Sequence, residues 1–139
     1  MYVLDTNVVS ELRKIRGGKA DRNVAGWAAN VPPAATFLSV ISIMELELGA
    51  LLIGRRDPAQ GATLRRWLEG RILPTYARRI LPIDTEIARR CAQLHVPNKR
   101  GERDALIAAT ALVHGMTVVT RNVADSQAAG LRVVNPWTA

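Results

Sequence analysis

Four acidic residues that lie far apart in the sequence are of the type that binds a divalent cation: Asp5, Glu45, Asp104 and Asp125. Asp5 ends a short apolar run at the N-terminus, Glu45 follows a second such run, and Asp104 opens an apolar helical segment. Oxygen ligands without histidine or cysteine favour Mg²⁺ or Mn²⁺. Such an ion polarises a phosphodiester and activates water for in-line attack. These carboxylates in a basic chain are therefore the combination that a nuclease needs.

Short apolar runs alternate with helical patterns along the whole chain. The apolar runs predict strands buried on both faces of a parallel sheet, and they are Tyr2–Leu4, Phe37–Ile41, Ile80–Ile83, Thr117–Thr120 and Leu131–Val134. Helical patterns cover Val8–Arg13, Arg22–Ala29, Ile43–Leu52, Ala62–Leu73, Glu86–Leu94 and Arg103–His114. This alternation predicts an α/β fold, a three-layer α/β/α domain with a mostly parallel, about five-stranded sheet. Pro82 predicts that the third strand is short.

The predicted fold brings the acidic residues to one place. Ligands of a parallel sheet bind outside the carboxyl ends of its strands, where Asp5 and the pair Asn122 and Asp125 directly follow strands. The helix that begins near Asp104 runs antiparallel to the strands, so its N-terminus lies at the same edge. From residue 105 to 113 only Thr110 is polar, which predicts a helix buried almost all round. Crowded carboxylates raise one another's pKa unless a cation joins them.

Each acidic residue also has a plain structural explanation. Asp5 could cap a short helix or open a turn. Asp104 could interact favourably with the dipole of its helix, because it lies near the helix N-terminus. Glu45 stands three residues after Ser42, which is the spacing of a capping box. Asp125 could be an ordinary turn residue. Capping does not require four separate elements to direct carboxylates to one place, so the joint pattern favours a site.

Two further glutamates are alternatives. Glu47 is two residues beyond Glu45 on the same predicted helix, a rotation of about 200°, so both cannot face one site. Glu11 either faces the site edge from the first helix or is a solvated helix residue.

Composition narrows the function classes. The chain has 139 residues, which predicts a single domain over 1–139. Its 19 basic and 12 acidic residues give a net charge of +7, compatible with a polyanionic partner or with the arginine-rich usage of a GC-rich genome. No phosphate-binding loop ending in Lys-Ser or Lys-Thr is present, which excludes a P-loop NTPase.

Cysteine and histidine usage argues against zinc. Cys91 is the single cysteine, so no intrachain disulfide is expected. His95 and His114 lie far apart, and we expect no cysteine or carboxylate at metal-ligand spacing from them. The chain has neither a signal-peptide pattern nor a long apolar run, which predicts a cytoplasmic protein.

Four segments carry a family resemblance: Val3–Glu11, Ser39–Leu46, Asp104–Ala111 and Val119–Asp125. Together with the closing Val133–Trp137 they closely resemble the PIN-domain family, and more narrowly the VapC-type toxin ribonucleases of type II toxin–antitoxin pairs. The resemblance covers the whole chain. It implies a metal-dependent endoribonuclease that hydrolyses RNA phosphodiester bonds with metal-activated water.

The resemblance also implies roles for individual residues. Asp5 and Asp104 would be the principal ligands of Mg²⁺, with Mn²⁺ as a substitute, and Glu45 would complete the metal shell or orient water. Many relatives carry an aspartate where this chain has Asn122, whereas Asp125 matches the second acidic position of the family and would be the fourth ligand. Ser126 replaces an aromatic that often follows, which leaves this fourth position open. The remaining expected site residues are Thr6, Asn7, Thr120 and Asn122, as supporting groups around the ligands, and Arg121, as an RNA phosphate contact.

The implied partners are RNA, a cognate antitoxin protein that blocks the active site, and a second copy of the chain, without a membrane. Apolar segments at Val24–Val31 and Ala50–Ile53 could form the protein interfaces. The alternative function is a non-catalytic PIN-like module that binds RNA or an antitoxin. A haloacid-dehalogenase-type phosphatase would need an aspartate where this chain has Asn7.

Overall fold

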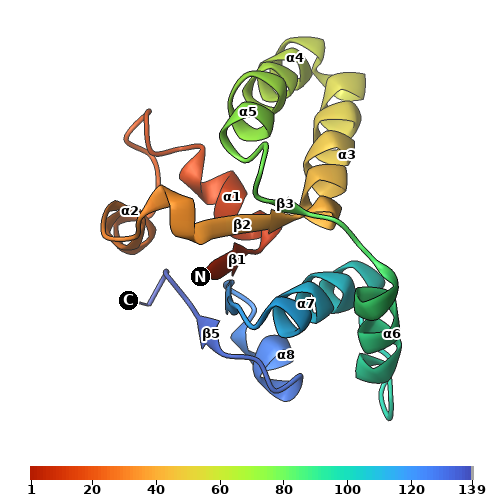
Figure 1. Cartoon of the computed structure of the whole chain (residues 1–139). Coiled ribbons are helices and arrows are strands. Elements are labelled where there is room, and N and C mark those ends of the chain that lie inside the picture. Colours follow the sequence, from red (N-terminus) through yellow and green to blue (C-terminus); the bar gives the residue numbers. More distant parts are fainter. Residues whose placement is uncertain (139) are drawn as a thin grey trace.

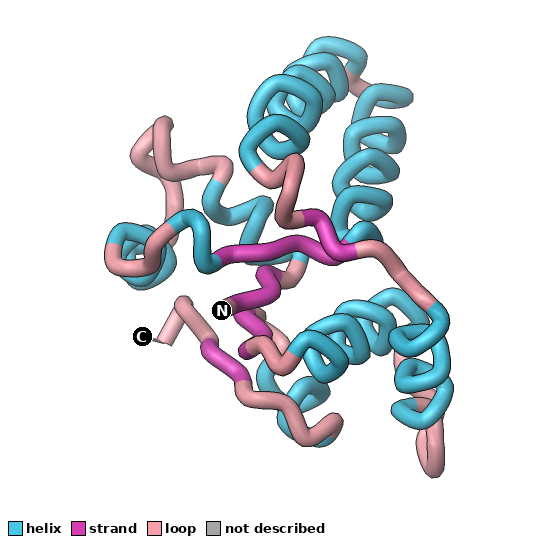
Figure 2. Tube along the Cα trace, in the orientation of Figure 1, coloured by secondary structure: helices cyan, strands magenta, loops and turns pink. Residues whose placement is uncertain are grey.

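The central element is a five-stranded sheet with strand order β3-β2-β1-β4-β5, in which every neighbouring pair is parallel. The computed structural model describes residues 1–138. The strands are β1 (Tyr2–Leu4), β2 (Thr36–Ser39), β3 (Ile80–Leu81), β4 (Thr117–Val119) and β5 (Val133–Val134). Central β1 pairs Tyr2 with Thr36 on one side and with Thr117 on the other. The predicted mostly parallel, about five-stranded sheet is confirmed (Figure 2).

Helices connect all the strands. They are α1 (Thr6–Leu12), α2 (Arg22–Ala29), α3 (Val40–Arg56), α4 (Pro58–Trp67), α5 (Leu73–Thr75), α6 (Thr85–Leu94), α7 (Glu102–His114) and α8 (Val123–Ala128). A short 3-10 helix covers Pro33–Ala35, and a π-helical turn at Leu68–Ile72 joins α4 to α5. The sequence pattern predicted α1, α2, α3, α4, α6 and α7, and its segment Ala62–Leu73 covers most of α4 and the π-helical turn. The pattern missed α5, because Pro74 directly follows that segment and is typical of a helix end, and it missed α8.

The two faces of the sheet are covered by different helices (Figure 1). Leu4 and Val119 face one side and pack with residues of α1, α3 and the segment from α4 to α5. Val3 and Val118 face the other side and pack against α7. Helix α7 is buried between the sheet and α6, as its apolar sequence predicted. These contacts confirm the three-layer α/β/α architecture.

Three strands, β2, β3 and β4, end earlier than the sequence pattern indicated, whereas β1 has the predicted bounds and β5 begins two residues later. The second apolar run continues as helix from Val40, because the Ser39 side chain accepts a hydrogen bond from Ile41 N–H and caps α3. Ser42 is therefore inside the helix, so the capping-box explanation of Glu45 is wrong. The third strand has only two residues, as Pro82 predicted.

Candidate metal centre

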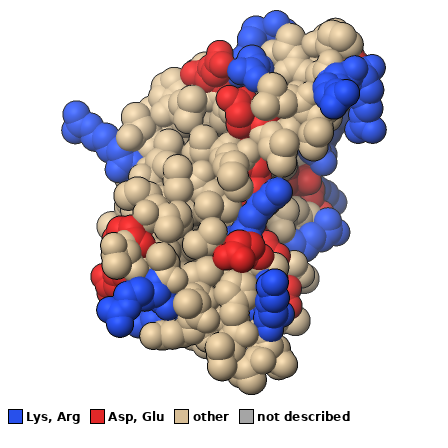
Figure 3. Space-filling view, turned by 90° about the vertical axis from the view of Figure 1, so that its right-hand side faces the viewer, with Lys and Arg blue, Asp and Glu red and all other residues tan. Residues whose placement is uncertain are grey.

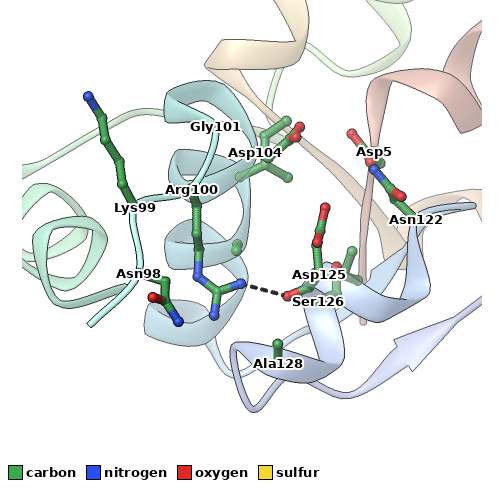
Figure 4. A pocket seen from close by; sticks show the side chains of 14 residues that line it. Asp5, Asn98, Lys99, Arg100, Gly101, Asp104, Asn122, Asp125, Ser126 and Ala128 are labelled. Atoms are coloured by element: carbon green, nitrogen blue, oxygen red, sulfur yellow. Dashed lines mark hydrogen bonds between the residues drawn. The ribbon is translucent and has the colours of Figure 1, made fainter. Parts of the chain in front are cut away.

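An open pocket of about 440 Å³ lies at the carboxyl edge of the sheet. Asp5, Asp104, Asn122 and Asp125 all line it. Figure 4 shows the side chains of the three aspartates directed toward a common space from three separate elements. The structure thus brings together four residues that the sequence analysis placed at this edge.

Asp5 follows β1 and is the N-cap of α1. Its Oδ1 accepts a hydrogen bond from Thr6 N–H at 2.8 Å. Its Oδ2 accepts one from the Thr120 hydroxyl at 2.7 Å, across 115 positions of sequence. Asn7 is exposed, and its side-chain amide lies 3.5 Å from the same oxygen. Each carboxylate oxygen has a second lone pair, so Asp5 is fixed in orientation and still able to bind a cation.

Glu45 approaches the same region from α3 but does not line the pocket. The Thr6 hydroxyl donates to Glu45 Oε1 at 2.7 Å, and the Ser42 hydroxyl lies 2.9 Å from the Thr6 hydroxyl. Glu45 Oε2 lies 3.7 Å from Arg103 Nη1. Thr6 therefore links Glu45 to Asp5, because its hydroxyl donates to Glu45 and its backbone N–H donates to Asp5.

The other two glutamates serve elsewhere. Glu47 lies 3.4 Å from Arg65 of α4. Glu11 accepts a hydrogen bond from Asp21 N–H at 2.8 Å, and this bond lowers the pKa of Glu11. Glu11 therefore fixes the loop between α1 and α2.

The surroundings of Asp104 shift the pKa of its carboxyl group. Desolvation raises the pKa of Asp104 above its ordinary value. The negative charges of the other three carboxylates raise this pKa further, in the order Asp5, Glu45 and Asp125, whereas Arg103 lowers it. The four carboxylates are thus close enough to repel one another, and a bound cation would relieve this repulsion.

Helix α8, which the sequence pattern missed, carries the last acidic residue. Asn122 is its N-cap and Asp125 lies in its first turn. The Thr120 hydroxyl accepts a hydrogen bond from Asn122 N–H at 3.0 Å while donating to Asp5. One buried threonine therefore connects Asp5 with the start of α8.

Arg100 is a pocket residue that the sequence reasoning missed. Its Nη1 donates to the backbone carbonyl of Asp125 at 2.9 Å (Figure 4), and its Nε donates to the carbonyl of Leu94 at 2.8 Å. Arg100 thereby ties α8 to the end of α6. The only signal in the sequence was a basic pair, Lys99 and Arg100, shortly before Asp104.

The spacing of the carboxylates suits a hydrated ion. Within residues 1–138, no three carboxylates of this pocket have oxygens within 4.8 Å of one another. Mg²⁺ keeps several water ligands and binds through one or two carboxylates. The all-oxygen donor set and the repulsion at Asp104 therefore fit Mg²⁺ or Mn²⁺, and because no three of these carboxylates converge, some of them would bind the ion through water.

Basic residues lie near the pocket without forming a uniform patch. The guanidinium of Arg121 stacks over the Trp137 ring, 5.0 Å from its centroid, and Arg121 does not line the pocket. On the face in Figure 3, acidic and basic side chains lie side by side. The net charge of +7 is therefore not gathered into a single basic surface on that face.

One expectation from the sequence is wrong. Cys91 and Glu102 do lie at metal-ligand distance from His95, with the donor atoms of all three within 4.8 Å of one another. His95 and Cys91 are one helical turn apart, and the loop between α6 and α7 returns Glu102 to them.

Comparison with known proteins gives concordant matches. The family model described as "PIN domain" matches residues 2–130. The chain is 40% identical to "VapC ribonuclease Y4jK" of Sinorhizobium fredii, over 99% of this chain and 98% of that protein. The crystal structure of FitAcB from Neisseria gonorrhoeae superposes with a TM-score of 0.89 at 35% identity, covering all of both chains. A toxin–antitoxin complex from Klebsiella pneumoniae superposes with a TM-score of 0.68 at 29% identity, covering 98% of both chains.

Proposed function

Because this chain belongs to the PIN-domain family, we propose that it is a metal-dependent endoribonuclease, the toxin of a type II toxin–antitoxin pair. The observation that carries this function is the pocket itself, where Asp5, Asp104 and Asp125 meet from three elements. The relative from Sinorhizobium fredii, named as a ribonuclease, supports RNA as the substrate.

The ion is Mg²⁺, with Mn²⁺ as a substitute, and Asp5 and Asp104 would be its principal ligands. Glu45 and Asp125 would complete the site through water, with Asn122 as a neutral neighbour. When bound, a divalent ion of this kind polarises the scissile phosphate and lowers the pKa of a water molecule that attacks it in line. The donor set of oxygens and the raised pKa of Asp104 support this assignment.

The protein's own residues prepare the site before any ion binds. Thr120 and the Thr6 backbone hold both oxygens of Asp5, and the Thr6 hydroxyl holds Glu45. These bonds fix the carboxylates in place, so little ordering remains to be done at the reaction step. Arg103 is half exposed, and its guanidinium can contact a phosphate with the N–H groups that do not face Glu45. Arg121 can donate to a phosphate while it stacks on Trp137, because its guanidinium plane and its N–H edge act separately.

The partners are an antitoxin protein, in a hetero-oligomer, and a second copy of this chain. Two apolar segments were candidates for these interfaces. In the segment 24–31, Val24 is buried in the core. The segment 50–53 instead exposes about half of Leu51 and Leu52, with Met44 also exposed on the same helix. Exposed apolar residues grouped on one helix support a protein interface there. Light scattering of the purified chain measures the oligomeric state, and we expect a dimer rather than a monomer.

We further propose a cytoplasmic location and a single domain over 1–139. No helix within residues 1–138 is both long and apolar enough to span a membrane. The proposed RNA substrate and antitoxin partner support a cytoplasmic location, since RNA is translated there.

The test of the proposed function is cleavage of structured RNA by the purified chain, with and without EDTA. We expect cleavage with Mg²⁺ or Mn²⁺, loss of cleavage in EDTA, and recovery when excess Mg²⁺ is added. Cleavage that continues in EDTA would contradict a metal-dependent site. Binding of RNA without any cleavage would favour the non-catalytic module instead.

A further inference from the structure

A second group of metal-binding side chains lies outside the carboxylate pocket, at Cys91, His95 and Glu102. Cys91 Sγ is 3.8 Å from His95 Nε2, and the same nitrogen is 3.8 Å from Glu102 Oε1. All three ligand atoms lie within 4.8 Å of one another. A sulfur, a nitrogen and an oxygen thus surround one point.

The fold explains why these residues meet. Cys91 lies in the last turns of α6 and His95 is its C-cap, so the two are four residues apart on one helical face. Glu102 is the first residue of α7, which packs against α6 through Cys91 and Ala105 among others. The cluster therefore joins the two ends of the loop 96–101.

The distances suit a zinc ion. Zinc binds sulfur at about 2.3 Å and nitrogen or oxygen at about 2.0–2.2 Å in a tetrahedron. Such bonds place the sulfur and nitrogen about 3.5 Å apart and the nitrogen and oxygen about 3.3–3.4 Å apart. The observed separations of 3.8 Å are slightly wider than these values. The Glu102 side chain is 71% exposed and can move inward to shorten the nitrogen-to-oxygen separation, whereas the sulfur-to-nitrogen separation needs a small rotation of the Cys91 or His95 side chain.

We propose that Cys91, His95 and Glu102 form a second metal site, selective for Zn²⁺ or a transition metal of similar chemistry. Thiolate and imidazole ligands favour such ions over Mg²⁺. Three protein ligands leave the fourth position to water, which reaches the site on the side of the exposed Glu102 and makes the ion exchangeable rather than structural.

A reactive-thiol role fits the same residues less well. Burial raises the pKa of the Cys91 thiol, and the charge of Glu102 raises it further, so the thiol is not activated as a nucleophile. His95 Nδ1 accepts a hydrogen bond from Arg100 N–H at 3.0 Å and does not donate to a carboxylate. An ion that binds here displaces the thiol proton, so binding releases protons.

The site is connected to the carboxylate pocket through Arg100. When His95 Nε2 binds an ion, the neutral ring carries its proton on Nδ1, which then cannot accept from Arg100 N–H. Binding of an ion therefore breaks the hydrogen bond from Arg100 N–H to His95. The guanidinium of the same Arg100 donates to the backbone carbonyl of Asp125, so the change reaches the carboxylate pocket. Occupancy of this site is expected to lower RNA cleavage several-fold, a consequence that rests on the proposed ribonuclease function.

Metal binding is tested first, on the Asp5→Asn/Asp104→Asn chain, which lacks the principal ligands of the other site. After equilibrium dialysis we expect one equivalent of Zn²⁺ or Co²⁺ per chain, with a sulfur-to-metal absorption band for Co²⁺. Replacing a residue that only hydrogen-bonds to a metal ligand lowers metal affinity by about 10–100-fold. Cys91→Ser and Glu102→Gln each remove a proposed ligand itself, so each should weaken binding by about 100-fold or more.

The exposed His114 provides the matched control, since His114→Asn should bind as before. Glu102→Gln alters an exposed side chain, and circular dichroism confirms that each variant is folded. No bound ion in the parent chain, or unchanged binding in folded Glu102→Gln, would overturn the site.

The coupling is tested by adding Zn²⁺ to Mg²⁺-supported RNA cleavage by the native chain and by Glu102→Gln. We expect inhibition in the native chain and little in the variant. Equal inhibition in both would mean that Zn²⁺ acts at the carboxylate pocket, which overturns the coupling but not the binding result. A native chain without RNA cleavage refutes the proposed function, and the dialysis result still decides the metal site.

Discussion

Asp5→Asn should lower the rate of RNA cleavage by about 10³-fold while the chain stays folded. Removing one electrostatic partner of the transition state typically costs about 10²–10³-fold in rate, and Asp5 is also a proposed principal ligand of the ion that activates water. The rate is measured with a fluorescent RNA at saturating Mg²⁺, together with the thermal midpoint Tm of each protein.

The structure explains why the fold should survive this change. Asn is as good an N-cap as Asp, so the side-chain oxygen can still accept from Thr6 N–H. The new amide can donate to the Thr120 hydroxyl, which has a second lone pair beside the one that Asn122 N–H uses. The change therefore removes the negative charge, keeps the N-cap hydrogen bond and reverses the direction of the hydrogen bond to Thr120.

Two control variants make the result specific. Asp21→Asn makes the same change at another helix N-cap, α2, and should leave cleavage unchanged. Thr120→Val removes only the hydroxyl that orients Asp5 and should cost about 10–100-fold, as expected for a partner of a metal ligand. Full activity in Asp5→Asn, or equal losses in Asp21→Asn, would contradict the assignment of Asp5.

Mg²⁺ should stabilise the native chain strongly and the Asp104→Asn chain much less. An ion that binds only the folded state contributes about 2.7 kcal/mol when its concentration is 100 times its Kd. For a domain of this size that is roughly a 10 °C rise in Tm. Asp104 is a proposed ligand, so its replacement should remove most of this rise. Thermal unfolding with and without Mg²⁺ measures both values.

Without a divalent ion the order of stability should reverse. The pKa of Asp104 is raised in the folded chain, so ionisation of this group is less favourable there than in the unfolded chain. Stability of the native chain then falls as the pH rises from the pKa of the unfolded state through that of the folded state. Asp104→Asn carries no such penalty and should have the higher Tm at neutral pH in EDTA, with no advantage below the ordinary pKa of aspartate.

A second aspartate variant is the control for these stability measurements. Asp57→Asn changes an N-cap aspartate of α4, far from the pocket, so it should keep the full Mg²⁺ stabilisation of the native chain and should show no reversal in EDTA. An Asp104→Asn chain that is less stable than the native chain in EDTA at neutral pH would contradict the repulsion among the four carboxylates. An unchanged Mg²⁺ effect would remove Asp104 from the proposed ligand set.

Local sequence pattern was sufficient for the sheet and for the position of three aspartates. Continuous apolar runs are typical of strands covered on both faces, and parallel strands place their carboxyl ends at one edge. Asp5 and Asp125 follow such runs, and Asp104 begins the helix that returns to the same edge, so the pocket could be located before any coordinates. Helix α8 was missed because its six residues carry no apolar periodicity.

The local surroundings of Glu45 could not be predicted from the sequence. The S-x-x-E spacing suggested a cap, whereas Ser39 caps α3 and Ser42 lies buried near the Thr6 hydroxyl. The sequence did not reveal that the second strand ends two residues earlier than its apolar run, because Val40 and Ile41 are equally compatible with a strand and with a helix. Burial against neighbouring elements overrides such local preferences.

The sequence by itself determined the fold class, the edge of the sheet where carboxylates meet, and the chemistry that their oxygens favour. Only the tertiary structure decided which groups orient them, since Thr120 reaches Asp5 across 115 positions and Thr6 reaches Glu45 across 39. The tertiary structure alone also brings Glu102 next to His95 and lets Arg100 donate a hydrogen bond to the Asp125 carbonyl of α8. The physical reason is that periodicity records which face of an element is buried, whereas a hydrogen bond or a metal site depends on the exact placement of side chains from elements packed together.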